Sequence, residues 1–97
     1  MDARGNRDAG RIAGVVAASL DDAVSTGDLA RRAFHSRTQF HRLFRALIEE
    51  TPAAMRRRLL LERAAWRLGR TDAPITEVAF DAQYGSLEAF SRTMQSL

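Results

Sequence analysis

Arginine is the residue type in this chain that is best suited to bind another molecule. The 97 residues carry a formal net charge of +3, and all 15 basic residues are arginine. The planar guanidinium group can donate two parallel hydrogen bonds to phosphate or to guanine, whereas lysine acts as a point charge. A GC-rich genome would also produce a chain rich in Ala and Arg and without Lys. The charge therefore supports nucleic-acid binding without establishing it.

Other kinds of chemistry find little support in the sequence. His35 and His41 have no nearby cysteine or acidic cluster, so we expect neither a metal site nor a catalytic histidine. The sequence has no Gly-rich phosphate loop, no paired catalytic carboxylates and no nucleophile with a base at usable spacing. We therefore expect no enzyme activity and no cofactor.

The length and composition limit the chain to one small domain, or to two very small lobes that share a helix. It is 45% hydrophobic and has no cysteine, which excludes a disulfide framework and a Cys-based zinc site. No apolar stretch approaches the ~20 residues of a membrane span, and the polar N-terminus lacks the apolar region of a signal peptide. These features predict a cytoplasmic protein, associated with the nucleoid if it binds DNA.

Two segments repeat the same order of residue types about fifty positions apart. Each copy has the pattern of a short apolar helix, a tight turn, a Ser that caps a second helix, and Phe-x-Arg within that helix. A helix-turn-helix requires this order of parts, because its second helix must lie in the DNA major groove. The repeat therefore predicts two helix-turn-helix lobes that read DNA. Its members are Leu29, Ala30, Ser36, Phe40 and Arg42, which recur as Val78, Ala79, Ser86, Phe90 and Arg92.

Apolar periodicity and capping residues predict the helices that position these segments. A disordered lead is expected at residues 1–7, which are polar and charged. The predicted capping pairs are Ser25 with Asp28 and Ser36 with Gln39. Ser86 is expected to cap a further helix, with Glu88 in its first turn, where an acidic side chain is favourable. Thr51 followed by Pro52 is a strong helix start, and Gly69 is expected to end that helix. The predicted helices span residues 8–20, 25–33, 51–68 and 75–81, with two more opened by Ser36 and Ser86.

We therefore predict an all-α chain in which a long connector helix joins the two lobes. The first lobe covers residues 8–50, the connector 51–70 and the second lobe 71–97. Two apolar bands run along the connector, one of Ala54, Leu61, Ala64, Ala65 and Leu68, and one of Met55, Leu59 and Trp66. Trp66 is expected to belong to the connector core. Between the bands lies a basic stripe that can face phosphates or only water, made of Arg56, Arg63, Arg67 and Arg70.

The chain resembles the DNA-binding domain of the AraC/XylS transcription regulators from about Ile12 onward. The closest stretches are S-R-T-Q-F-H-R-L-F at residues 36–44, Thr51-Pro52, L-E-R-A-A at residues 61–65 and I-T-E-V-A at residues 75–79. The resemblance implies two homeodomain-like three-helix units on one connector, sequence-specific DNA binding and regulation of transcription. RNA polymerase is a further partner that it implies, and a small-molecule effector would need a domain outside this chain.

The resemblance also implies which side chains contact DNA. On the first recognition helix, helical geometry turns Phe40, Phe44 and Leu47 inward. Arg42 is expected to grip guanine, while Leu87 suits a thymine methyl and Glu88 suits cytosine N4. The expected base-reading residues are Thr38, His41, Arg42, Leu87, Glu88, Ser91 and Arg92. The expected phosphate contacts are Arg37, Arg45, Arg56 and Arg63.

The chain departs from the family pattern at several positions. Phe34, Glu49 and Gln83 stand where the family often has glycine, and each costs on the order of 1 kcal/mol if its backbone is left-handed. Leu60 replaces a residue that is usually basic. The chain also stops at Leu97, before the final short helix of the family, so the second lobe is expected to be incomplete at its C-terminus, as in a truncated fragment.

Two other functions remain open at the level of sequence. A truncated or degenerate homologue would pair with a protein through its second lobe and would not bind DNA specifically. A helical adaptor without a nucleic-acid role would require the arginine stripe to lie away from both recognition helices.

Overall fold

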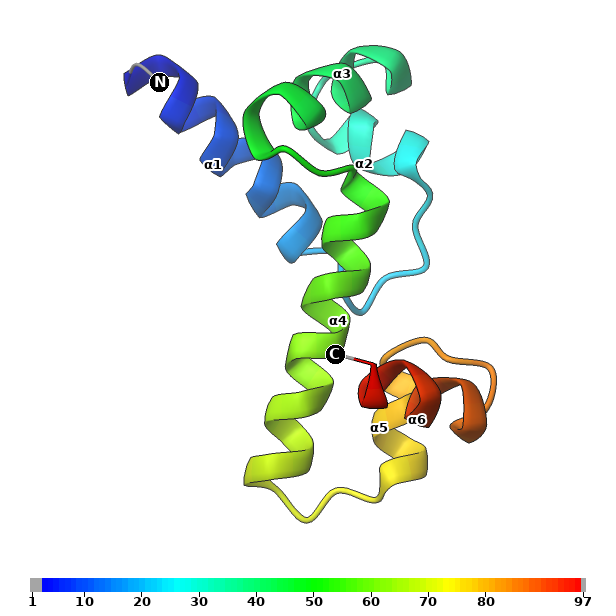
Figure 1. Cartoon of the computed structure of the whole chain (residues 1–97). Helices are drawn as coiled ribbons and strands as arrows, with labels where there is room; N and C mark the ends of the chain where they lie inside the picture. The colour runs from blue at the N-terminus through cyan, green and yellow to red at the C-terminus, as the bar shows by residue number, and fades with distance from the viewer. Residues whose placement is uncertain (1–2, 97) are drawn as a thin grey trace. The chain divides into compact units, whose positions relative to one another are not determined.

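The computed structural model describes residues 3–96, with side chains from Arg7 onward, and this part of the chain contains helices and no strand. The predicted all-α class is therefore confirmed. Figure 1 shows the order of the helices along the chain. They are α1 (Ala3–Ala17), α2 (Thr26–Arg32), α3 (Arg37–Ile48), α4 (Pro52–Arg70), α5 (Ile75–Asp81) and α6 (Leu87–Gln95).

The chain divides into two compact units, Met1–Arg57 and Arg58–Leu97, and the boundary falls inside α4. The first unit contains α1, α2, α3 and the first turns of α4. The second contains the rest of α4 together with α5 and α6. Each unit thus holds one copy of the repeated helix-turn-helix segment. The finer boundaries of the lobes stay a prediction.

The core of the first unit forms where α3 packs against α1 and α2. Ile12 and Val16 lie one helical turn apart on α1 and are fully buried, and Leu29 of α2 is 2% exposed. Phe40 and Phe44 fill the space that α3 faces, with ring centroids 5.5 Å apart and planes tilted by 58°. Burial of these large side chains, at roughly 1.5–3 kcal/mol each, holds α3 in place.

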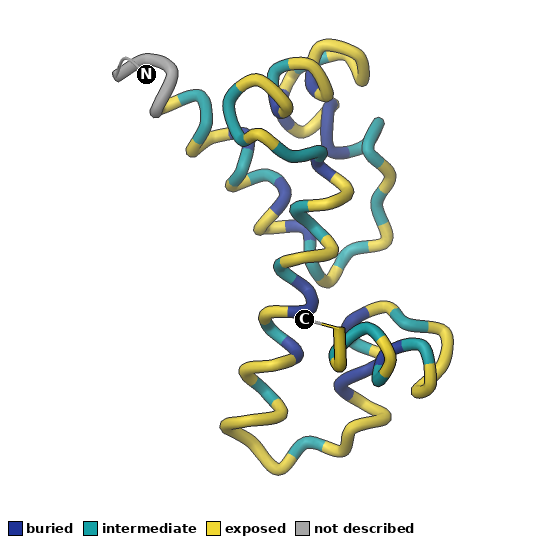
Figure 2. The backbone as a smooth tube through the Cα atoms, in the orientation of Figure 1, coloured by how far each residue is buried: buried dark blue, intermediate teal, exposed yellow. Residues whose placement is uncertain are grey.

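The core of the second unit is smaller. Figure 2 shows buried stretches alternating with exposed ones along α4. Phe90 is fully buried, and its ring meets that of Tyr84 nearly edge-on at 5.5 Å. The buried cluster around Phe90 consists of Leu61, Ala64, Val78, Ala79 and Ala82.

The predicted caps are confirmed. Ser25 and Ser36 each form a complete capping box, in which the serine hydroxyl accepts from the third helical N–H and that residue's side chain accepts from the serine N–H. The hydroxyl of Ser86 likewise accepts from the backbone N–H of Ala89 at 3.1 Å. Each cap satisfies an N–H group that the helix itself leaves unpaired.

The start and end of α1 differ from the prediction. The helix begins at Ala3, where a disordered lead was expected over residues 1–7, and Met1 and Asp2 lie outside the described residues. Once packing of Ile12 and Val16 stabilises the helix, each further residue adds one hydrogen bond, so a polar lead can remain helical. At the other end α1 stops at Ala17 rather than Leu20, because Ser19 turns back and its hydroxyl donates to the carbonyl oxygen of Val16 at 2.7 Å.

The prediction for the connector was partly wrong. Gly69 does not end α4, which continues to Arg70 and stops where the N–H and hydroxyl of Thr71 both donate to the carbonyl of Arg67. Trp66 is 57% exposed and is no core residue, because it lies ~140° around the helix from Leu61, which faces the core. Ala54, Ala65 and Leu68 of the predicted apolar band are exposed too, whereas Leu60, outside both predicted bands, is buried.

Candidate nucleic-acid interface

The face of α3 opposite the core presents a continuous set of polar and cationic side chains. Phe40 and Phe44 lie one helical turn apart and face inward. The residues on the opposite face of α3, which also recur every three or four positions, therefore face solvent. A surface hollow of about 610 Å³ lies along this face. Its lining consists of Arg37, Thr38, His41, Arg42 and Arg45, all exposed and all from α3.

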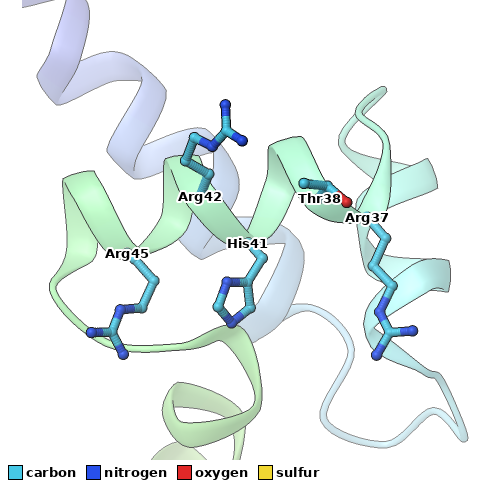
Figure 3. Close-up of a pocket in the computed structure, with 5 residues that line it drawn as sticks. All are labelled: Arg37, Thr38, His41, Arg42 and Arg45. Carbon is cyan, nitrogen blue, oxygen red and sulfur yellow. The ribbon is translucent and has the colours of Figure 1, made fainter.

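The lining of this hollow contains three arginines and no carboxylate. Figure 3 shows Arg37, His41 and Arg45 extending to one side of α3 and Arg42 to the other. Guanidinium groups along both sides of a helix suit a duplex groove, where bases lie between two phosphate backbones. The structure thus brings together every residue that the sequence assigned to the first recognition helix.

The turn before α3 is held by backbone contacts. Ala33 closes α2, and the N–H groups of Phe34 and His35 donate to carbonyl oxygens of α2 at 3.0 and 2.9 Å. From α1, Nη1 of Arg11 donates to the carbonyl of Ala33 at 3.1 Å, and Nη2 lies 3.4 Å from Nε2 of His35. Arg11 is a positioning residue for this turn that the sequence did not reveal, because its partner lies 22 positions away along the chain.

The backbone is left-handed at the three positions where this chain lacks the glycine that is common in the family. The φ angles are 61° at Phe34, 67° at Glu49 and 66° at Gln83, and these are the positive φ angles among the described non-glycine residues. Phe34 and Gln83 lie in the turns of the two helix-turn-helix segments, and Glu49 closes α3. The turns therefore keep the geometry of a glycine turn although other residues occupy them.

The second recognition helix, α6, presents a different chemistry. Leu87 is 39% exposed, Glu88 and Arg92 are exposed, and Ser91 is half-buried. These four positions carry one cation and one anion, whereas the lining of the α3 hollow has three arginines and no acidic residue. Glu88 lies in the first turn of α6, where a carboxylate also interacts favourably with the helix dipole.

The predicted basic stripe of the connector mostly serves the interior of each unit. Nη2 of Arg56 donates to the carbonyls of Ser19 and Asp22 at 3.1 and 2.6 Å. Nη2 of Arg63 donates to the carbonyl of Asp81 at 3.3 Å. The structure therefore gives Arg56 and Arg63 hydrogen-bond partners inside the protein, and the phosphate contacts expected of them stay a prediction.

Arg67, the third member of the stripe, ties α4 to α5. Its Nη1 lies 2.6 Å from Oδ2 of Asp81, and its Nη2 lies 3.7 Å from a carboxylate oxygen of Glu77. The Arg67 side chain is 23% exposed, so this ion pair is partly shielded from water. Arg70, at the end of α4, is exposed. Sequence periodicity placed these arginines on one face but carried no information about the acceptors opposite them.

Two other kinds of site were sought among the described residues, a metal centre and a membrane-spanning helix. Among them no three His, Cys, Asp or Glu side chains are grouped so as to hold a metal ion. No helix within the described range has both the length and the apolar character required to span a membrane.

These features define the class of the protein. Two short helix-turn-helix segments with a buried phenylalanine in each recognition helix and an exposed cationic face on α3 are typical of a DNA-binding domain. The profile of a family described as a helix-turn-helix domain matches residues 29–97, which include both segments. This family is the AraC-type helix-turn-helix DNA-binding domain, and the chain belongs to it. No curated protein matches the chain.

Proposed function

We propose that the chain is a sequence-specific regulator of transcription that places α3 and α6 in successive segments of the major groove of promoter DNA. The observation that carries this proposal is the exposed face of α3, which gathers Arg37, Arg42 and Arg45 without a carboxylate among the residues that line its hollow. The family of the chain, which consists of DNA-binding domains of transcription regulators, supports the same function.

Each side chain of α3 has a role that fits its position. Thr38, His41 and Arg42 lie toward the middle and beginning of the helix, where recognition helices contact base edges. Arg42 suits guanine O6 and N7, which accept a bidentate pair of hydrogen bonds. Arg37 and Arg45 lie nearer the ends of the helix and suit phosphates that flank the contacted bases.

The exposed residues of α6 would read a second half-site with different bases. Leu87 suits contact with a thymine methyl, and Glu88 suits acceptance of a hydrogen bond from cytosine N4. Ser91 and Arg92 complete this set. Because the two recognition helices carry different side chains, one copy of the chain would read an asymmetric site with half-sites about one helical turn, ~34 Å, apart.

The cellular setting follows from this role. A regulator of this kind acts in the cytoplasm on nucleoid DNA, and RNA polymerase is the partner through which it would alter transcription. An effector molecule belongs to this picture only if a further domain binds it.

The experiment that tests the proposal is selection of duplexes from a randomised pool by the 97-residue chain at near-physiological salt. We expect enrichment of a bipartite motif with halves about one helical turn apart. Enrichment of a single half-site would limit specific reading to one lobe. No enrichment by a chain that is folded by circular dichroism would overturn the proposal and favour a protein-interaction module.

Arg42→Ala then tests the base-reading role at single-base resolution. We expect it to lower affinity by about 1–3 kcal/mol and to relax preference at one position of the selected motif. The matched control is Arg57→Ala, which removes an exposed arginine of α4. We expect that control to leave every base preference unchanged. An equal loss for all duplexes with Arg42→Ala would contradict a base contact.

A further inference from the structure

We infer that Phe34 is an additional DNA-contacting residue, which lays its aromatic ring against the apolar sugar and base edges at the border of the site read by α3. This inference deepens the proposed function and rests on it. At the level of sequence, neither the position of Phe34 in the turn nor its side-chain type indicates this role.

The exposure of Phe34 is the first observation. The residue is 92% exposed, more than any other exposed large hydrophobic residue in the described part of the chain. The phenylalanines that follow it in the two recognition helices, Phe40, Phe44 and Phe90, are fully buried. A phenyl ring in water contributes nothing to the core and leaves a large apolar surface hydrated.

The backbone of Phe34 is the second observation. Its φ angle of 61° lies in the left-handed region, where a side chain with a Cβ is unfavourable relative to glycine. Gln83 occupies the corresponding place in the second lobe with nearly the same φ of 66°, but it is polar. Phe34 thus combines an unfavourable backbone with an unfavourable exposure, and stability of the fold explains neither.

The position and surroundings of Phe34 indicate its partner. It stands two residues before Ser36, the N-cap of α3, and so lies at the end of the recognition helix that carries Arg37 and Thr38. Arg31, one turn back along the chain, has a side chain that is 74% exposed and forms an ion pair with Asp28. An apolar ring three residues before Arg37 suits a surface that offers both phosphates and apolar sugar or thymine-methyl groups, which double-stranded DNA combines along its groove edge.

The turn is also rigid enough to present the ring. The N–H of Phe34 donates to the carbonyl of Arg31 at 3.0 Å, and Arg11 fixes the carbonyl of Ala33. A side chain on a fixed turn loses little conformational freedom on binding, which favours contact.

The test compares Phe34→Gly, Phe34→Asn and the control Gln83→Gly on the duplex that wild-type chain selects. Glycine relieves the left-handed backbone in both lobes, so we expect Phe34→Gly and Gln83→Gly to be more stable than wild type. Asparagine removes the ring and tolerates the same backbone. We expect both Phe34 variants to bind DNA about tenfold more weakly, as for partial burial of one aromatic ring, and the Gln83 variant to bind within about twofold of wild type.

The salt dependence of binding separates a ring contact from a displaced helix. Loss of an uncharged ring leaves the slope of log affinity against log salt unchanged, whereas a displaced α3 loses phosphate contacts and flattens the slope. A flattened slope, or Phe34 variants that bind as well as wild type, would overturn the inference. Such a result would favour contact of the Phe34 ring with a protein partner. A loss with Phe34→Gly but not with Phe34→Asn would overturn it as well, because chain flexibility would then be the cause. If wild type selects no duplex, it is the proposed function that fails.

Discussion

Replacement of Glu49 by glycine should stabilise the chain, because this residue closes α3 with an unfavourable backbone. Its φ and ψ angles are 67° and 16°, and its N–H donates to the carbonyl of Arg45 at 3.1 Å. The side chain is exposed, so no buried contact is lost on substitution. Glycine keeps this conformation without the Cβ clash, and the backbone hydrogen bond of the cap is retained.

The size of the effect follows from three contributions. Relief of the left-handed backbone raises the free energy of unfolding by roughly 1–2 kcal/mol. The greater freedom of glycine in the unfolded chain lowers it by roughly 0.5–1 kcal/mol. Removal of a carboxylate from the C-terminus of a helix contributes about 0.3–1 kcal/mol. The sum predicts that Glu49→Gly raises the free energy of unfolding by about 1 kcal/mol.

Urea denaturation followed by far-ultraviolet circular dichroism measures this gain, with Glu49→Ala and Ala46→Gly as controls. Glu49→Ala removes the charge but keeps the Cβ, so it should gain only a few tenths of a kcal/mol. Ala46→Gly places glycine at an exposed position inside α3 and should lose about 1 kcal/mol. The reasoning is refuted if Glu49→Gly is no more stable than Glu49→Ala.

Two further predictions concern charged side chains. Arg67→Gln should lower the stability of the second unit by up to about 1 kcal/mol, because it removes the ion pair with the carboxylate of Asp81 at 2.6 Å, which water partly screens. Fluorescence of Trp66, which lies in that unit, follows the loss. The backbone N–H of Ser25, followed by its hydroxyl, holds the pKa of Asp28 below the ordinary value of 3.8. A lowered pKa in the folded state stabilises the fold above the unfolded value and ceases to do so as the pH falls through the folded one. Asp28→Asn should therefore be less stable than wild type at neutral pH, and the difference should shrink as denaturation is measured below about pH 3.8.

The helix starts that carry a capping side chain were predictable from the sequence, because a cap depends on contacts within a few residues. The hydroxyl of Ser36 and the side chain of Gln39 satisfy each other's backbone N–H groups across three positions, so the residue types and their spacing identify the cap. Burial of Phe40 and Phe44 follows from helical periodicity in the same way. The opposite face of α3, and with it the first set of candidate DNA contacts, is the geometric consequence.

The roles of the connector arginines could not be predicted in this way. Arg56 donates to carbonyls 34 and 37 positions earlier, and Arg63 to one 18 positions later. Helical projection places a side chain on a face of its own helix, but it does not say which backbone groups of other segments lie within reach. Trp66 was misassigned for the same reason, since only packing decides which of two apolar bands faces a core.

The sequence by itself determined the order of the helices and their caps, because these depend on spacing along the chain. For the same reason it determined which residues lie on the cationic outer face of α3 and on the outer face of α6, which has both charges. The resemblance to a family that often has glycine there drew attention to Phe34, Glu49 and Gln83, and the structure showed that their backbone is left-handed. Only the tertiary structure decided that Phe34 is exposed to solvent. It also decided that Arg11, Arg56 and Arg63 donate hydrogen bonds to backbone carbonyls of distant segments. Exposure and hydrogen-bond partners depend on segments that the fold brings together from distant parts of the chain, and local sequence does not encode their distances.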